Sequence, residues 1–247
     1  DGTVQAQVAY GNGPSDQSST RQAVFDQVTG LQAGYAFNEP SGNALDLTSN
    51  GNDGTVNGAT QGATGITGSG YSFDGSNDSI SLTSGVLSAV SLSDFTISTW
   101  VFRQATGNDT YVGFISNSFT NFILIRNNST FPNFRLRNNS GDVLDLNAPS
   151  ISTGVWTLVT ATYNRTSGEA EIFYDGVLQV SETFVDKDID VTGENPRIGS
   201  DGRDTDFFNG RMDDLRIYSA TLSPDDIQAT FDASKTTPDF FDQQAPL

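Results

Sequence analysis

Carboxylates are the side chains best suited to chemistry in this 247-residue chain, because it contains neither histidine nor cysteine. Histidine is the commonest general base and a common metal ligand, and cysteine supplies the thiolate nucleophile. Their absence excludes serine–histidine and cysteine–histidine catalysis in the usual forms. It also excludes disulfide bonds, so a buried apolar core must stabilise the fold.

Paired carboxylates would be the remaining route to catalysis. Glycoside hydrolases place two of them about the scissile bond, roughly 5–5.5 Å apart in retaining enzymes. Glu169 and Glu171 are spaced to share one face of a strand, but no third acid continues the pattern. We interpret this pair as a solvated strand edge. The sequence therefore predicts that the protein is not an enzyme.

Arginines interleaved with aromatic residues are the clearest candidates for ligand binding. Arg126, Arg135 and Arg137 fall near predicted loops, together with Tyr111 and Phe119. Guanidinium groups bind carboxylate and sulfate groups through paired hydrogen bonds, so such a cluster would suit an acidic glycan. We predict Tyr111, Arg126, Arg135 and Arg137 as ligand-binding residues. Trp100 and Trp156 lie within strand patterns, so we expect both of them in the core.

The charge of the chain excludes two classes of partner. Thirty acids face twelve bases, which gives a formal net charge of -18. Such a field repels nucleic-acid phosphates and anionic membrane surfaces. No apolar run approaches the roughly 20 residues of a membrane span, so membrane insertion is not expected. We interpret the acidic runs 186–190 and 201–206 as solvated loops.

Short runs of alternating apolar and polar residues must position these side chains. Gly, Asn, Ser, Thr and Asp separate the runs, which is typical of an all-β fold of antiparallel strands. We expect an N-terminal arm over residues 1–28, a two-sheet sandwich over 29–233 and a C-terminal tail over 234–247. A short helix is predicted within 20–28, and another begins at Pro224, where Ser223 is the cap. The predicted strands are 33–37, 71–73, 79–82, 95–102, 111–116, 122–126, 133–138, 143–146, 156–163, 170–174, 177–180, 197–199 and 211–218.

Four motifs in a fixed order add a family likeness to this pattern. They are Tyr35–Gly42 with Asp46–Thr55, Tyr71–Asp78 before the strand 95–102, Trp156–Tyr163 before Ile172–Gly176, and Phe208–Tyr218 before Leu222–Ile227. In this order the chain resembles the laminin-G-like, concanavalin-A-like jelly-roll modules of bacterial extracellular proteins. The resemblance implies an antiparallel jelly-roll sandwich in a secreted or cell-surface protein.

The same resemblance implies a structural calcium ion. Mapped by motif, the ligands would be Asp46 and Asn52 from the early loop and Asp213 from the late strand. Calcium takes oxygen ligands in a flexible geometry, so one ion would join two distant segments. The alternative is that Asp46 caps a turn and Asp213 accepts a backbone hydrogen bond.

Two kinds of function remain open from the sequence. The first is a binding module for a carbohydrate or a cell-surface ligand. The second is a structural subunit of a filament, surface layer or virion. The well-patterned strand at residues 3–10 motivates the second, because such a strand can pair with a neighbour's sheet edge and residues 1–13 would then mediate self-association. Alternatively, that strand adds an edge to its own sheet.

Overall fold

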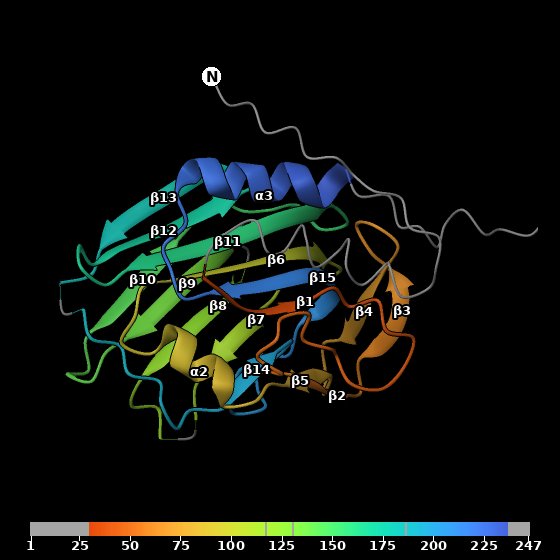
Figure 1. Ribbon diagram of the computed structural model, residues 1–247, viewed down its shortest axis with the longest axis horizontal. Coiled ribbons are helices and arrows are strands. Elements are labelled where there is room, and N and C mark those ends of the chain that lie inside the picture. Colours follow the sequence, from red (N-terminus) through yellow and green to blue (C-terminus); the bar gives the residue numbers. More distant parts are fainter. Residues whose placement is uncertain (1–29, 117, 130, 186, 237–247) are drawn as a thin grey trace, which may run out of the picture.

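A computed structural model describes residues 30–236 of the chain except 117, 130 and 186. In these ranges the strands form two antiparallel sheets that pack face to face (Figure 1). The predicted two-sheet antiparallel sandwich is therefore confirmed. The predicted arm at 1–28, including the proposed self-association segment 1–13, and residues 237–247 lie outside the described residues.

The larger sheet has the strand order β13-β12-β11-β6-β15-β4-β3, and β1 also pairs with β15. The bounds of its strands are β1 Leu31–Tyr35, β3 Thr60–Thr64, β4 Ser69–Asp74, β6 Phe95–Arg103, β11 Trp156–Asn164, β12 Glu169–Tyr174, β13 Val177–Thr183 and β15 Asn209–Tyr218.

The smaller sheet has the order β10-β9-β8-β7-β14-β5-β2. The bounds of its strands are β2 Thr55–Asn57, β5 Ser79–Ser81, β7 Asp109–Phe114, β8 Phe122–Asn128, β9 Phe131–Arg137, β10 Val143–Asn147 and β14 Pro196–Ile198. Each sheet contains strands from both halves of the sequence, so residues far apart along the chain become neighbours on one face.

The core lies between the sheets and is built by alternation along the strands. In β10, Leu144 and Leu146 are buried and the residues between and beside them are exposed. Aromatic rings join the layers, as where Phe95 of the larger sheet meets Phe134 of the smaller one edge to face at 6.1 Å. Removing this apolar surface from water is the main stabilising contribution available to a chain without disulfides.

Two helices in the described residues cover different parts of the sandwich. The six-residue helix α2, Gly85–Val90, buries its apolar side chains at one end. The helix α3, Pro224–Thr236, lies across the outer face of the larger sheet (Figure 1). Ser223 caps it as predicted, since its Oγ accepts a hydrogen bond from the amide of Asp226 at 3.2 Å.

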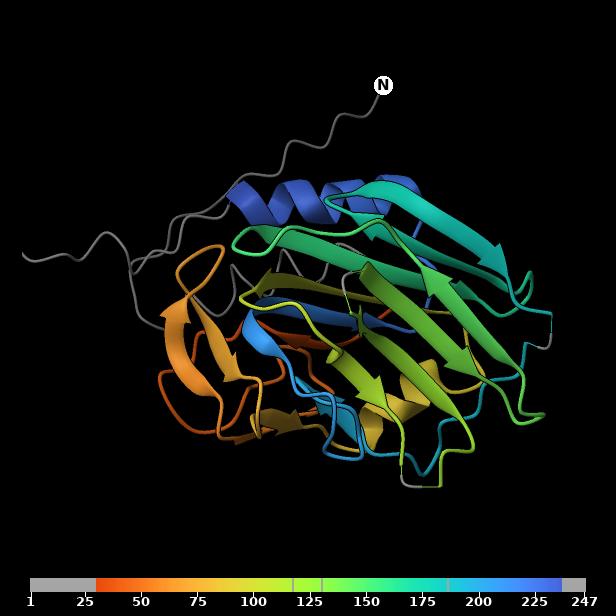
Figure 2. The ribbon, with the colours of Figure 1, turned by 180° about the vertical axis from the view of Figure 1, so that it is seen from behind.

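The outer face of the smaller sheet has no such cover from the described residues. Figure 2 shows β7, β8, β9 and β10 side by side, and no helix lies in front of the face that they turn to the reader. In β8, β9 and β10, every second side chain therefore points outward, away from the core. The predicted arginine cluster lies on this open face.

The structure differs from the predicted elements in three places. The segment 38–70, expected to be a loop, contains β2 and β3, and α2 was not expected at all. The helix beginning at Pro224 continues to Thr236, past the expected domain end at residue 233. The chain between Asn38 and Gly70 is rich in Gly, Asn and Thr, so apolar alternation, the main strand signal, is weak there.

Candidate functional site

The outward side chains of β8, β9 and β10 form rows across the smaller sheet. One row joins Arg126 of β8 to Asn133 of β9 and Asn147 of β10. The next joins Leu124, Arg135 and Asp145, and the third joins Phe122, Arg137 and Val143. The strand register thus brings Arg126, Arg135 and Arg137 onto one face, as expected of a cluster. We call this surface, together with Arg203 and Phe119 described below, the arginine face.

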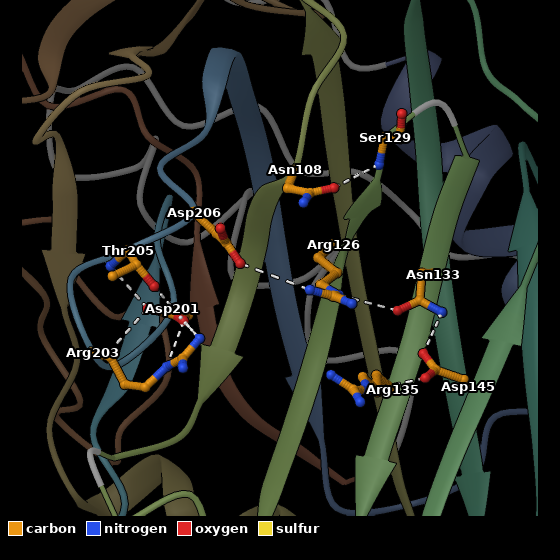
Figure 3. Close-up of polar contacts among 10 residues, drawn as sticks. All are labelled: Asn108, Arg126, Ser129, Asn133, Arg135, Asp145, Asp201, Arg203, Thr205 and Asp206. Carbon is orange, nitrogen blue, oxygen red and sulfur yellow. Dashed lines mark hydrogen bonds and ion pairs between the residues drawn. The ribbon is translucent and has the colours of Figure 1, made fainter.

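Arg126 is fixed by two partners (Figure 3). Its Nε donates to Asn133 Oδ1 at 3.2 Å, and its Nη1 lies 3.7 Å from Asp206 Oδ2. Burial lowers the pKa of Arg126, and the neighbouring charge of Arg135 lowers it further. The side chain is only 14% exposed. Arg126 is therefore a fixed base of the cluster rather than its most accessible group.

Arg135 and Asn133 share one carboxylate, that of Asp145. Arg135 Nε forms an ion pair with Asp145 Oδ2 at 3.1 Å, and Asn133 Nδ2 donates to Asp145 Oδ1 at 3.1 Å (Figure 3). The Arg135 guanidinium also lies 5.2 Å from the centre of the Phe122 ring. These contacts hold Arg135 against the sheet and leave it one-quarter exposed. Fixing a guanidinium in advance lowers the entropy lost when a ligand binds.

Two further guanidinium groups gather on the ring of Phe119. Arg137 lies 5.8 Å and Arg203 lies 4.7 Å from its ring centre. Arg137 also donates through Nη1 to the carbonyl of Phe119. The ring is held edge to face on Phe122 at 5.3 Å, within a small apolar cluster on this outer face. Cation–π contacts of this kind stabilise positive charge at an aromatic face.

The loop 200–206 supplies Arg203 and folds onto the sheet around a buried carboxylate. Asp201 accepts hydrogen bonds from the amides of Arg203 and Thr205 at 3.1 and 2.9 Å, and its side chain is 1% exposed (Figure 3). Gly113 of β7 permits this approach, because a Cβ there would lie 3.0 Å from the Cα of Asp201. The prediction that 201–206 is wholly a solvated loop is therefore wrong for Asp201.

Arg137 stands apart from the other cations of the arginine face in its electrostatic pairing. Arg126, Arg135 and Arg203 form ion pairs with Asp206, Asp145 and Asp201. Among the described residues, no carboxylate lies within ion-pair distance of Arg137. Its charge is balanced only by a carbonyl and a ring, so it is the group on this face best able to pair with an anion from solution.

Tyr111, the fourth predicted ligand-binding residue, is a correction. Its side chain is fully buried, and its hydroxyl donates to Asn127 Oδ1 at 2.8 Å. Its ring packs edge to face on Phe208 at 5.3 Å. A register shift in β7 between Thr110 and Val112 breaks the alternation of faces, so Tyr111 points into the core. Tyr111 therefore supports the sheet from beneath and offers no surface to a ligand.

The three predicted calcium ligands are used for internal hydrogen bonds. Asp46 Oδ1 accepts from the amides of Gly34 and Thr48 at 3.1 and 3.0 Å, and Oδ2 accepts from the amide of Asn52 at 2.9 Å. The side chain of Asn52 accepts from Thr83 Oγ1 at 2.8 Å and donates to the carbonyl of Gln32 at 3.1 Å. The Asp46 carboxylate thus organises the early loop as a turn cap.

Asp213 belongs to a different neighbourhood. Its carboxylate accepts from the amide of Ile66 at 3.0 Å in the β3–β4 turn, and burial raises its pKa well above the ordinary range. No contact joins it to Asp46, and among the described residues no group of three acids is placed to hold a metal ion. These hydrogen bonds are those of the alternative, in which Asp46 caps a turn and Asp213 accepts a backbone hydrogen bond. Calcium binding by Asp46, Asn52 and Asp213 stays a prediction, which a melting-temperature shift between chelator and millimolar calcium would test.

A shallow depression outside the arginine face offers no free positive charge. It is lined by Leu92, Ser93, Asp94, Arg165, Thr166, Lys187 and Asp188. Arg165 pairs with Asp188 at 2.7 Å, and Lys187 donates to the carbonyl of Thr166. Both cations are committed to neighbouring residues, so we do not take this depression as the site.

Within the described residues, no helix has the length and apolar character needed to cross a membrane.

Solved structures with a similar fold include a domain of an arabinanase in complex with a sugar and the binding domains of two toxins. One is domain 4 of AbnA, a GH43 extracellular arabinanase from Geobacillus stearothermophilus, in complex with arabinotriose, with a TM-score of 0.63 and 22% identity over 81% of this chain and 98% of that one. A second is the binding domain of Paraclostridial Mosquitocidal Protein 1, with a TM-score of 0.66 and 19% identity. A third is the binding domain of botulinum neurotoxin serotype D, with a TM-score of 0.61 and 18% identity. Each covers 83% of this chain, which spans 52% of either toxin domain.

At identities below 25%, these solved structures show a shared fold alone. The sequence comparisons show the family. No curated protein sequence matches the chain significantly. A family model described as the concanavalin A-like lectin/glucanases superfamily matches residues 74–228, which is more than half of the chain and includes the whole arginine face. The chain belongs to the concanavalin A-like lectin/glucanases superfamily.

Proposed function

We propose that this chain is a non-catalytic, extracellular carbohydrate-binding module that binds an acidic glycan on its arginine face. The observation that carries the proposal is the gathering of Arg126, Arg135, Arg137 and Arg203 on the open sheet face of a protein with a net charge of -18. Of these four arginines, Arg126, Arg135 and Arg203 are paired with aspartates. Among the described residues, Arg137 is left without a carboxylate partner.

The chemistry of the face suits a sugar that bears an anionic group. Arg137 has no carboxylate partner among the described residues, so its guanidinium is the group we assign to the ligand's carboxylate or sulfate. Asp145 and Asn147 expose their polar atoms on the neighbouring strand β10, where they would bind hydroxyl groups. Arg126 and Arg135, each paired with an aspartate, order the surface around Arg137 and are not assigned to the ligand.

One of the similar structures supports a carbohydrate as the class of ligand. The arabinanase domain is described in complex with arabinotriose, and the toxin domains are described as binding domains. A sandwich of this shape therefore carries a sugar in at least one other protein. The extracellular setting is part of our proposal and is supported by the arabinanase, which is described as extracellular.

Affinity electrophoresis and calorimetry test the proposal directly. The probes are polygalacturonate, which carries carboxylates, dextran sulfate, which carries sulfates, and neutral dextran. We expect the protein to bind at least one charged polymer and not dextran. Arg137→Gln should weaken binding about tenfold, since a charge-assisted hydrogen bond is worth about 1.5–3 kcal/mol.

A matched control separates the site from net charge. Arg165→Gln removes one positive charge at the distant depression and should leave the affinity unchanged. If neither charged polymer binds, or if Arg135→Ala and Arg137→Ala both retain full affinity, the arginine face is not the binding site. The alternative of an assembly subunit depends on residues 1–13, and deleting them would show whether oligomers are lost in light scattering.

A further inference from the structure

A second group of aromatic and arginine side chains lies on the opposite outer face, that of the larger sheet. Trp156 of β11, Phe102 of β6 and Arg211 of β15 occupy one row across three neighbouring strands. All three side chains are partly exposed. We call this group the aromatic platform.

The contacts within the aromatic platform are close and specific. The rings of Phe102 and Trp156 have centres 5.5 Å apart at an angle of 55°. The Arg211 guanidinium lies 4.0 Å from the centre of Phe102 and 5.4 Å from that of Trp156. Its Nη1 donates to the carbonyl of Thr64 at 2.6 Å. The guanidinium is thus held beside two rings by a defined hydrogen bond.

Within the described residues, no ring contact or hydrogen bond joins α3 to the aromatic platform. Two positions from Phe102 on the same face of β6, Trp100 is covered by Phe231, with ring centres 5.7 Å apart, and its Nε1 donates to Ser234 Oγ at 3.0 Å. Trp100 is 1% exposed as a result. Trp156 was expected in the core alongside Trp100, but none of the described helical residues stacks on it, and it is partly exposed.

Charge complementarity indicates what would complete the aromatic platform. Among the described residues, no carboxylate lies within ion-pair distance of Arg211, although the chain has 30 acids. A half-exposed indole is a suitable surface for the apolar face of a sugar ring, since it removes apolar area from water without a polar penalty. A carboxylate on that ring would supply the anion that the protein itself does not place beside Arg211.

We propose that the aromatic platform is a second glycan site, specific for a sugar ring that carries a carboxylate. The ring stacks on Trp156, and Arg211 pairs with the carboxylate through its remaining N–H groups. The site is independent of the arginine face, because the two lie on opposite outer faces of the sandwich (Figures 1 and 2).

The two tryptophans make the proposal directly measurable. Trp100 is buried, so ligand-induced change in intrinsic emission reports on Trp156. The probe is trigalacturonic acid, and galactotriose is its neutral counterpart. We expect a saturable emission change with trigalacturonic acid and a dissociation constant at least tenfold larger for galactotriose. Trp156→Phe keeps an aromatic ring and should remove the signal, which assigns it.

Arg211→Gln should raise the dissociation constant for trigalacturonic acid about tenfold, as seen by emission. Arg137→Gln should leave this titration unchanged, so failure of the arginine face and failure of the aromatic platform are distinguishable. Arg165→Gln is the charge-matched control. The melting temperature of each variant checks that it is folded. An unchanged emission spectrum in the wild type, equal affinity in Arg211→Gln, or a dimer that buries Trp156 in light scattering would overturn the proposal.

Discussion

The outer faces of the two sheets differ in how their side chains are covered and held. On the larger sheet, α3 covers Trp100, and beside it two rings and one arginine stay partly exposed. The smaller sheet has no helical cover from the described residues, and its outward side chains are braced by polar contacts along and between strands. Packing thus orders the outer face of the larger sheet, whereas hydrogen bonds and ion pairs order the outer face of the smaller sheet.

The difference shows where free charge remains. On the arginine face, carboxylates from β10 and the 200–206 loop neutralise three guanidinium groups and leave Arg137 available. On the aromatic platform the guanidinium of Arg211 rests on rings and a carbonyl. We infer that the arginine face recognises charge and that the aromatic platform recognises the sugar ring together with its charge.

Replacing the covered tryptophan should have the largest effect on stability. Trp100→Ala removes a buried side chain and its hydrogen bond to Ser234, and we expect a loss of about 3–5 kcal/mol in the free energy of unfolding. Trp156→Ala removes a partly exposed ring and should cost about 1 kcal/mol. Urea denaturation of both variants measures the two losses. Equal losses would mean that α3 does not distinguish the two positions.

The buried acid beneath the smaller sheet should make stability depend on pH. Asp109 is 3% exposed, and burial raises its pKa to about 7 from an ordinary value of 3.8, while hydrogen bonding by Asn127 and the charge of Arg103 act the other way. The native state then holds its proton between pH 3.8 and about 7, where the unfolded chain has lost it. This contribution to stability is complete below pH 3.8 and is lost as the pH rises to about 7.

Asp109 should change the free energy of unfolding by at most about 1.4 kcal/mol per pH unit within this window. Asp109→Asn keeps the size of the side chain and should flatten this part of the profile, as measured by urea denaturation across the window. Asp94→Asn at the distant depression is the control. A profile that is the same in Asp109→Asn as in the wild type would show that the acid is ionised in the native state.

Removing the carboxylate that folds the 200–206 loop should affect the arginine face alone. Asp201→Ala leaves the amides of Arg203 and Thr205 without their acceptor, and we expect a loss of about 2 kcal/mol in stability together with weaker binding of charged glycans. Asp204→Asn, at an exposed position of the same loop, should change neither. Emission titration of Trp156 should be the same in both variants. If it changes in Asp201→Ala, the two faces are coupled.

Much of the fold follows from local patterns in the sequence. Alternation predicted most strands of the two sheets within a few residues. The pair Asp175–Gly176 marks the β12–β13 hairpin, where both residues have positive φ. The strands β2 and β3 were missed because they are short and mostly polar, so apolar alternation is weak in them. The partner of β2 is also distant in sequence, since β2 pairs with β5. The helix α2 was missed because six residues are too few to show a helical period.

The candidate sites were only partly predictable, for a related reason. The i, i+2 spacing of Arg135 and Arg137 places them on one face, but Arg203 reaches them only through tertiary folding of a loop more than sixty residues away. Tyr111 was misplaced because a register shift changes the parity of β7. Trp156 was assigned to the core because a strand pattern does not reveal where the covering helix ends.

Ionic strength should separate the two faces by a smaller but diagnostic margin. Attraction between exposed charges is screened over about 10 Å at 0.1 M salt and about 3 Å at 1 M. Binding of polygalacturonate to the arginine face, isolated in Arg211→Gln, should therefore weaken several-fold between 0.05 and 0.5 M NaCl. Binding of trigalacturonic acid to the aromatic platform, isolated in Arg137→Gln, should weaken less, because stacking on Trp156 persists in salt. Calorimetry at both salt concentrations compares them, and an equal loss at both faces would show that Trp156 adds no stacking to the binding of the sugar.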